Sequence, residues 1–333
     1  MNIFWAIILL IGGLAILWKS AELLVSGAVG LAQRLGVSSL VTGLTVVAMG
    51  TSAPEVAASI AGVLQKANGG DIAIGNVFGS NIANLALVGG LIALIRPLVV
   101  SKQTIRRDVP VMLATALLLW PFLRNSEISR IEAAILLIVF VTLILLIAHI
   151  ARKEAQHSRL IAGSLEAATE YEMKSIPKSV IFVIIGLIGL AAGAEMTVRG
   201  AVSIGIRIGL SEGVIALTMI ALGTSLPELV TCVVAAIKGE HDISVGNLVG
   251  SNIFNTLLVT GAAGMVRPFE VSSQFAGGID YWIMIIVSLV FAVLIIIGKN
   301  VIGRISGVIL LCGYFAYIIY LFAYGSPTVQ AAY

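Results

Sequence analysis

The sequence reads MGTSAPE at positions 49–55 and LGTSLPE at 222–228, each within a stretch that is otherwise strongly apolar. The proline interrupts a helix and the acidic residue places a charge at the interruption, and both are costly in a lipid environment. The same pattern occurs twice in the same order. We therefore expect two matching segments that serve one purpose.

The composition is that of an integral membrane protein. Of the 333 residues, 59% are hydrophobic and 11% are charged, and the mean hydropathy is +1.08. Apolar runs that are long enough to cross a bilayer predict ten helices. The predicted spans are 3–32, 38–64, 72–95, 108–123, 128–150, 179–205, 212–237, 243–266, 279–298 and 301–323. The fold class is therefore all-α, a polytopic membrane protein with ten transmembrane helices.

The distribution of lysine and arginine predicts the orientation, because these residues concentrate in cytoplasmic loops. With the N-terminus outside, the inward loops hold 13 of them and the outward loops hold 5, and Lys19 and Arg199 lie inside helices. We expect a multi-pass protein of the cell (inner or plasma) membrane with both termini extracytoplasmic. The net charge of +3 follows from this bias and gives no evidence of nucleic-acid binding.

The chain contains an internal repeat. Residues 21–55 align with 194–228 at an offset of 173 with 18 identities in 35 positions, and GNVFGSNIANLALVGG at 75 aligns with GNLVGSNIFNTLLVTG at 246. Five spans in each half, an odd number, insert the second half in the opposite direction. We expect inverted repeats at 1–151 and 179–333, joined by a cytoplasmic loop at 152–178. Such repeats with interrupted helices are typical of secondary transporters.

The interrupted segments supply oxygen atoms. Pro54 and Pro227 lack an N–H, so the turn before each opens and exposes carbonyl groups, and Glu55 and Glu228 follow directly. Within the bilayer, interrupted backbone must be buried in protein or line a polar cavity. Alternatively, each Glu is protonated or hydrogen-bonded and only fixes helix packing. The doubled occurrence favours a binding role.

The second motif adds neutral polar groups. Ser80 and Asn84 share a helix face, as do Ser251 and Asn255, since each pair is spaced four residues apart. Four further asparagines either join this site or hold helices together. They are Asn76, Asn81, Asn247 and Asn252.

Taken together, the motifs offer carboxylates, hydroxyls and carbonyls, without thiolate or imidazole. Hard cations such as Ca2+ prefer such oxygen cages, whereas transition metals favour nitrogen or sulfur. Two carboxylates balance one divalent ion. Because Na+ also takes oxygen ligands, it can compete for overlapping parts of the cage, which makes exchange physically possible.

GTSAPE with GNVFGSN, repeated as GTSLPE with GNLVGSN, resembles the alpha repeats of the cation/calcium exchanger superfamily, most closely its prokaryotic sodium/calcium exchangers. The resemblance implies alternating access in which the first and sixth helices slide across a rigid core. It further implies that Glu55 and Glu228 bind Ca2+ together with the carbonyls of Thr51 and Thr224. The Na+ sites would be lined by Ser52, Ser80, Ser225, Ser251 and the carbonyls of Ala48 and Ala221, with Asn84 and Asn255 completing the central layer.

The expected function is Na+/Ca2+ antiport by a monomeric transport unit without a cofactor. The alternatives are Ca2+/H+ antiport, whose branch of the superfamily typically carries GNA-x-E in place of GTS-x-PE, and K+-dependent Na+/Ca2+ exchange. Some archaeal members of the superfamily have Asp at the position of Asn255. Proton coupling in those members therefore cannot be carried over to this chain. An intramembrane enzyme is not expected, because the sequence has no HExxH and neither motif pair contains His. Glu22 and Glu195 either guard ion entry or pair with Lys19 and Arg199, and the second role is favoured.

Overall fold

The chain is described here from a computed structural model that covers residues 2–65, 69–163, 176–209, 221–273 and 275–324. Within these residues the structure is predominantly helical. Eight helices are long and apolar enough to cross a membrane. They are Ile3–Leu35, Ser39–Leu64, Gly69–Ile95, Arg130–Lys153, Ile176–Arg207, His241–Val266, Ile279–Ile297 and Arg304–Leu321.

The two remaining predicted spans are shorter in the described chain. The span predicted at 108–123 corresponds to α7 (Val109–Leu123), which follows the π-helical turn η3 (Thr104–Asp108). The span predicted at 212–237 is represented by α11 (Ala221–Thr224) and α12 (Leu226–Lys238), and its residues 212–220 lie outside the described part.

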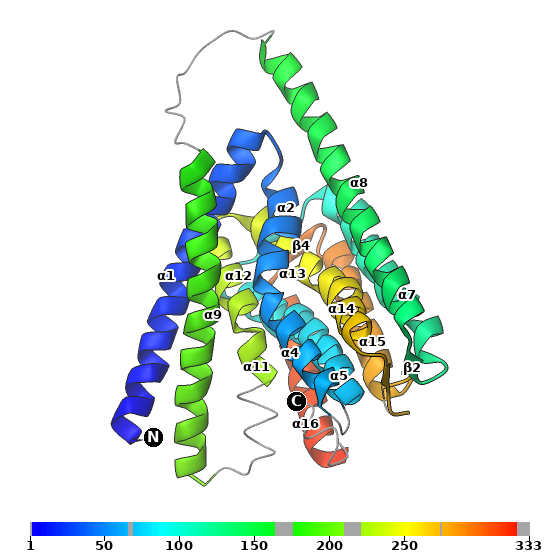
Figure 1. Cartoon of the computed structure of the whole chain (residues 1–333). Coiled ribbons are helices and arrows are strands. Elements are labelled where there is room, and N and C mark those ends of the chain that lie inside the picture. The colour runs from blue at the N-terminus through cyan, green and yellow to red at the C-terminus, as the bar shows by residue number, and fades with distance from the viewer. Residues whose placement is uncertain (1, 66–68, 164–175, 210–220, 274, 325–333) are drawn as a thin grey trace.

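Helices α1 (Ile3–Leu35) and α9 (Ile176–Arg207) run antiparallel along one side of the bundle (Figure 1). Glycines allow close backbone contact: a Cβ added at Gly13 would lie 2.8 Å from the Gly193 carbonyl oxygen, and one at Gly200 would lie 2.7 Å from that of Ala6. Small residues at such interfaces are the usual basis of close helix packing in membranes. The two halves therefore contribute their first helices to a single closely packed pair.

Each half then contains an interrupted helix. In the first half the described elements are α2 (Ser39–Thr42), the π-helical turn η1 (Gly43–Val47), α3 (Ala48–Thr51) and α4 (Ala53–Leu64). In the second half, α11 and α12 correspond to α3 and α4. The interruptions are at Ser52, with φ −82° and ψ 5°, and at Ser225, with φ −88° and ψ 1°. A proline in the first turn of the following helix lacks the N–H that would continue the ladder.

The helix after each interrupted segment also has the same construction in both halves. The first consists of α5 (Gly69–Ile82), the π-helical turn η2 (Ala83–Val88) and α6 (Gly89–Ile95). The second consists of α13 (His241–Phe254), the π-helical turn η5 (Asn255–Val259) and α14 (Thr260–Val266). Single π-helical turns inside α-helices are frequent at functional sites.

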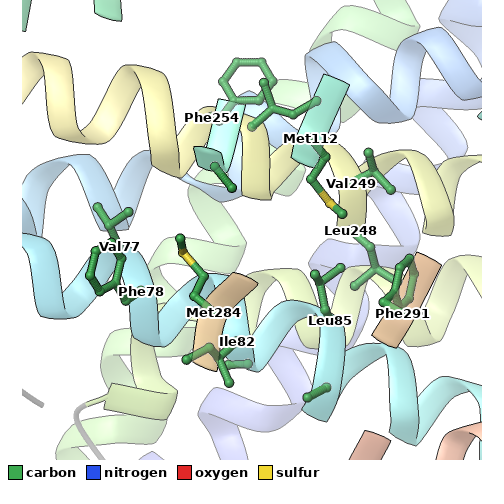
Figure 2. Packing of buried hydrophobic residues seen from close by; sticks show 14 of the residues in the cluster. Val77, Phe78, Ile82, Leu85, Met112, Leu248, Val249, Phe254, Met284 and Phe291 are labelled. Atoms are coloured by element: carbon green, nitrogen blue, oxygen red, sulfur yellow. The ribbon is translucent and has the colours of Figure 1, made fainter. Parts of the chain in front are cut away.

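The remaining helices surround this centre. They are α7, α8 (Arg130–Gly163), α15 (Ile279–Ile297) and α16 (Arg304–Tyr324). Figure 2 shows apolar side chains from α5, η2, α7, α13 and α15 meeting in one cluster, among them Phe78, Met112, Leu248 and Phe291. The motif-bearing helices therefore rest on a large apolar core.

Two short antiparallel sheets link the halves. Strand β1 (Leu98–Val99) pairs with β4 (Val301–Ile302), and β2 (Glu127–Ile128) pairs with β3 (Phe269–Glu270). Figure 1 shows β4 and β2 at opposite ends of the bundle. The all-α prediction missed these strands, and the span predicted from 301 in fact begins with β4. The reason is that a two-residue strand depends on a partner from the other half and leaves no periodic pattern in the sequence.

The link between the halves differs from the prediction in its helical content. Helix α8 continues to Gly163, well into the loop predicted at 152–178, and α9 begins at Ile176. Residues 164–175 lie outside the described part. The first turn of α1 and the last turns of α16 lie at the same end of the bundle (Figure 1), which fits an even number of spans.

Candidate functional site

Glu55 and Glu228 lie in the first turns of α4 and α12, directly after the interruptions. Their relative exposures are 0% and 1%, and the charge of Glu228 acts on Glu55. Neither is paired with Lys or Arg in a salt bridge within the described residues. The structure thus brings two carboxylates, 173 residues apart in sequence, together in the interior.

Hydrogen bonds across the halves join the two interruptions. Ser52 Oγ donates to Glu228 Oε1 at 3.3 Å, and Ser225 Oγ lies 3.5 Å from Ser80 Oγ. Thr51 Oγ1 donates to Asn247 Oδ1 at 3.1 Å. Ser80 also lies near the Glu55 carboxylate, and Thr51 lies near that of Glu228. Each carboxylate therefore has at least one hydroxyl group near it, and both halves contribute to the site.

Several polar atoms of this region are buried and make no hydrogen bond within the described residues. They are Glu55 Oε1 and Oε2, Glu228 Oε2, Ser251 Oγ, and the side-chain oxygen and nitrogen of Asn84 and Asn255. Buried polar groups in proteins are nearly always partnered, so a cluster of exceptions needs an explanation. Bound cations would satisfy the oxygen atoms, because the set is rich in carboxylate and neutral oxygens.

The π-helical turns place the two asparagines. Asn84 is the second residue of η2 and Asn255 is the first residue of η5, and both have 0% exposure. Ser80 and Ser251 lie one turn earlier, in α5 and α13, and are also buried. The sequence predicted the shared face of each pair, but it gave no indication of the π-helical geometry.

The backbone groups expected at the site have mixed surroundings. The Ala48 carbonyl accepts hydrogen bonds from Ser52 N at 3.0 Å and from Thr51 Oγ1 at 3.4 Å. Ala221 begins α11 and its side chain lies outside the described part, while Thr224 ends α11 and is half-buried. The carbonyl of Ala48 therefore has protein donors of its own, in contrast to the side-chain oxygens above.

Two further asparagines support the interrupted helices. Asn76 Nδ2 donates to the Glu55 carbonyl at 3.1 Å and to Ser59 Oγ at 2.9 Å. Asn247, at the equivalent position of the second half, donates to Cys232 Sγ at 3.1 Å in addition to its bond with Thr51. Ser59 and Cys232 are themselves equivalent at the offset of 173. A thiol therefore replaces a hydroxyl in one half, which the sequence alignment could have indicated.

The other two asparagines of the motif have different contacts. Asn81 Nδ2 donates to Thr256 Oγ1 at 3.2 Å and lies 3.4 Å from Met284 Sδ. Asn252 Nδ2 donates to the Leu248 carbonyl one turn earlier, at 2.8 Å. Asn81 therefore links helices, and Asn252 bonds within its own helix.

A cleft of about 580 Å³ leads to the interruptions. Its walls come from α9, α3, the first turns of α4, α11 and the start of α12, and Thr51, Pro54, Thr224 and Pro227 line it. Away from this cleft, α1 packs against α12, and Lys238 Nζ bonds Ser26 Oγ at 3.2 Å and the Glu22 carbonyl at 3.3 Å. The site is therefore approached between α9 and α4, and α1 covers α12.

Glu22 and Glu195 each form the ion pair that the sequence favoured. Lys19 Nζ lies 2.8 Å from Glu22 Oε2, and Arg199 Nε lies 2.5 Å from Glu195 Oε1. Glu195 also lies on the wall of the cleft. Both carboxylates are partly exposed and stand apart from the buried pair.

Known proteins resemble this chain over most of its length. The sequence profile of the family described as sodium/calcium exchanger protein matches residues 5–148 and 178–323. The sodium/calcium exchanger MaX1 of Methanosarcina acetivorans is 32% identical, with 95% of this chain and 98% of that protein covered. The inner membrane protein YrbG of Escherichia coli is 36% identical, with 94% and 96% covered.

A solved structure has the same fold. The sodium-calcium exchanger NCX_Mj, soaked with Na+ and Ca2+, superposes with a TM-score of 0.79 at 29% identity, covering 95% of this chain and 98% of that one. The resemblance extends through both motif-bearing segments and the helices around them. This chain belongs to the sodium/calcium exchanger protein family.

Proposed function

We propose that the protein is a secondary antiporter that exchanges Na+ for Ca2+ by alternating access, with Ca2+ held between Glu55 and Glu228. The observation that carries this proposal is the meeting of two buried carboxylates from the two halves without a basic partner in the described residues. Two negative charges at such depth are costly unless a cation compensates them. A divalent ion provides that compensation.

The surrounding groups fit a hard cation. In this proposal the carbonyls of Thr51 and Thr224 complete the Ca2+ site, and Asn84 and Asn255 close the central layer. Ca2+ takes six to eight oxygen ligands and accepts both carboxylate and carbonyl groups. Among the described residues, the proposed ligands are oxygen atoms, whereas a transition metal would favour thiolate or imidazole.

Sodium would use the neutral oxygens next to the carboxylates. The proposed Na+ ligands are Ser52, Ser80, Ser225, Ser251 and the carbonyls of Ala48 and Ala221. The hydrogen bond from Ser52 to Glu228 supports this, because it places a proposed Na+ ligand against a proposed Ca2+ ligand. The two ions would then exclude each other, and exchange follows from that exclusion.

The architecture proposed for this cycle is ten spans in two inverted repeats, 1–151 and 179–333, with 152–178 as the cytoplasmic connection, both termini outside, and a monomer as the transport unit. Two features support the inverted arrangement. Helices α1 and α9 are antiparallel, and at each end of the bundle a strand of one half pairs with a strand of the other. In this orientation the cleft opens outward and α1 seals the inner side against α12. The resulting conformation faces outward.

The proposal is tested by 45Ca2+ uptake into proteoliposomes of the purified protein. Vesicles loaded with Na+ are compared with vesicles loaded with K+ and with vesicles that carry only a pH gradient. Uptake that requires internal Na+ supports the proposal, and uptake driven by the pH gradient alone would replace it with Ca2+/H+ exchange. A requirement for K+ together with Na+ would indicate K+-dependent exchange.

The same assay tests the site. Glu55→Gln and Glu228→Gln should each reduce uptake to the level of empty vesicles. The matched control is Glu132→Gln, because Glu132 lies at the start of α8, where it accepts hydrogen bonds from Ser129 outside the site. Full activity in either of the first two variants would remove the carboxylate pair from the mechanism.

A further inference from the structure

Two arginines occupy equivalent positions in the two halves. Arg96 ends α6 and Arg267 ends α14, and each is followed by a proline and then by a strand of one of the sheets. Their backbones have nearly the same conformation, with φ −147° and ψ 121° at Arg96 and φ −150° and ψ 121° at Arg267. The backbone N–H of each bonds the carbonyl four residues earlier, at 2.8 and 3.0 Å.

Each arginine reaches into the opposite half. Arg96 Nη1 donates to the carbonyls of Ala236 at 3.1 Å and Ile237 at 2.9 Å, at the end of α12. Arg267 Nη1 donates to those of Val63 at 3.4 Å and Gln65 at 3.5 Å, at the end of α4. These two helices are the ones whose first turns carry Glu228 and Glu55.

From these contacts we infer that Arg96 and Arg267 are positioning residues. Each holds the end of the other half's interrupted helix in place. It thereby fixes how far the glutamate in the first turn of that helix extends into the bundle. The last carbonyls of a helix have no partner within the helix, and a cation there also interacts favourably with the helix dipole. Helices α4 and α12 have only 12 and 13 residues, so their far ends lie close to the glutamates.

The arginines are well suited to this role because their own positions are fixed. The strand after Arg96 pairs with β4, and the strand after Arg267 pairs with β2. Each guanidinium therefore extends from a segment that is already tied to the opposite half. The shorter distances at α12 predict that Arg96 contributes more than Arg267.

The first test is hydrogen exchange measured by mass spectrometry on the purified full-length protein. Arg96→Gln should speed exchange at the end of α12, near Lys238 and Glu240, and leave the end of α4 unchanged. Arg267→Gln should do the reverse. The controls are Arg304→Gln and Arg124→Gln, which remove exposed arginines that, within the described part of the chain, form no hydrogen bond with either helix. Faster exchange in the arginine's own half, or equal effects in the controls, would overturn the inference.

The second test rests on the proposed function and uses Ca2+ uptake driven by internal Na+. Arg96→Gln should raise the apparent KM for Ca2+ about two- to fivefold, the effect expected of a cation at an exposed helix C-terminus. Maximal uptake per folded protein should change less, and Arg96→Lys should restore part of the affinity. An unchanged KM would overturn the positioning role. If the unaltered protein showed no Na+-driven Ca2+ uptake but the variants still gave the expected hydrogen-exchange results, only the proposed function would be refuted.

Discussion

Ser52 of the first half donates a hydrogen bond to Oε1 of Glu228 in the second half, over 3.3 Å. The serine lies at the interruption between α3 and α4, and the glutamate lies in the first turn of α12. The hydrogen bond links the two halves directly at the buried carboxylate site. It also makes one hydroxyl relevant to both proposed ions.

We therefore expect Ser52→Ala to weaken exchange without abolishing it. A hydrogen bond to a charged group is worth about 1.5–3 kcal/mol, so the apparent KM for Ca2+ should rise about tenfold or more. The Na+ concentration for half-maximal exchange should also rise, because Ser52 is a proposed Na+ ligand. Uptake measured over both ion concentrations checks this, with Ser52→Thr as the control that keeps the hydroxyl. An Ala variant with unaltered ion dependence would contradict the assignment.

Asn247 should be more important than its place in an apolar segment suggests. Asn247→Ala removes the acceptor for Thr51 Oγ1 and the donor to Cys232. Each lost hydrogen bond is worth about 0.5–1.5 kcal/mol, because Thr51 Oγ1 keeps its longer bond to the Ala48 carbonyl and Cys232 keeps its bond to the Ser244 carbonyl. Both the thermal stability in detergent and the Ca2+ affinity should fall. Asn252→Ala is the matched control, because the hydrogen bond that its side chain makes within the described residues is to Leu248 of its own helix. Equal effects of the two substitutions would show that Asn247 has no special connection to the site.

The glycines of the GTS motifs should be required for the movement of α9. A Cβ at Gly50 would lie 2.4 Å from Leu187 Cδ2, and a Cβ at Gly223 would lie 2.3 Å from Val198 Cγ2. Both contacts are with the ends of partly buried side chains, which can shift in this conformation, but the added methyl group would obstruct α9 as it moves. Gly50→Ala should therefore slow exchange several-fold, and adding Leu187→Ala should restore much of the rate. A Cβ at Gly313 has nothing within 4 Å, so Gly313→Ala is the control. Failure of the double variant to recover would mean that the contact with Leu187 is not the obstacle.

Cys232 should be replaceable by serine but not by valine. The equivalent residue Ser59 bonds Asn76 as Cys232 bonds Asn247, so a hydroxyl fits the same role. Cys232→Val keeps the volume but leaves Asn247 Nδ2 without its partner, which should lower the stability by roughly 1–3 kcal/mol. Thermal unfolding in detergent and Ca2+ uptake measure both effects. If Cys232→Val matches the unaltered protein, the thiol acts only as a small apolar group.

Much of the arrangement was predictable because the two halves are similar. The offset of 173 pairs Glu55 with Glu228, and the structure places both in equivalent first turns with the same burial. The positions of the apolar helices followed from length and composition alone, since lipid permits few alternatives. The pairing of Glu22 with Lys19 was also expected, because the two residues are near each other in the sequence.

Other features could not be predicted from one sequence. The π-helical turns at Asn84 and Asn255 arise from small changes in hydrogen-bond register that no composition signal marks. The contacts of Arg96 with Ala236 and Ile237 join residues about 140 positions apart, and they depend on how the halves dock. The extension of α8 to Gly163 was missed because its last turns are polar and resemble a loop.

The two sheets also suggest how such a chain could originate. A single half contains one strand for each end of the bundle, β1 and β2, and neither pairs within that half. Two identical copies inserted in opposite directions would supply each other's missing strands at both ends. Such an ancestral dimer of five-helix chains would have been complete before any connecting segment existed. Duplication of its gene and fusion of the two copies would then have fixed the pairing and allowed the halves to diverge, as at the equivalent positions Ser59 and Cys232.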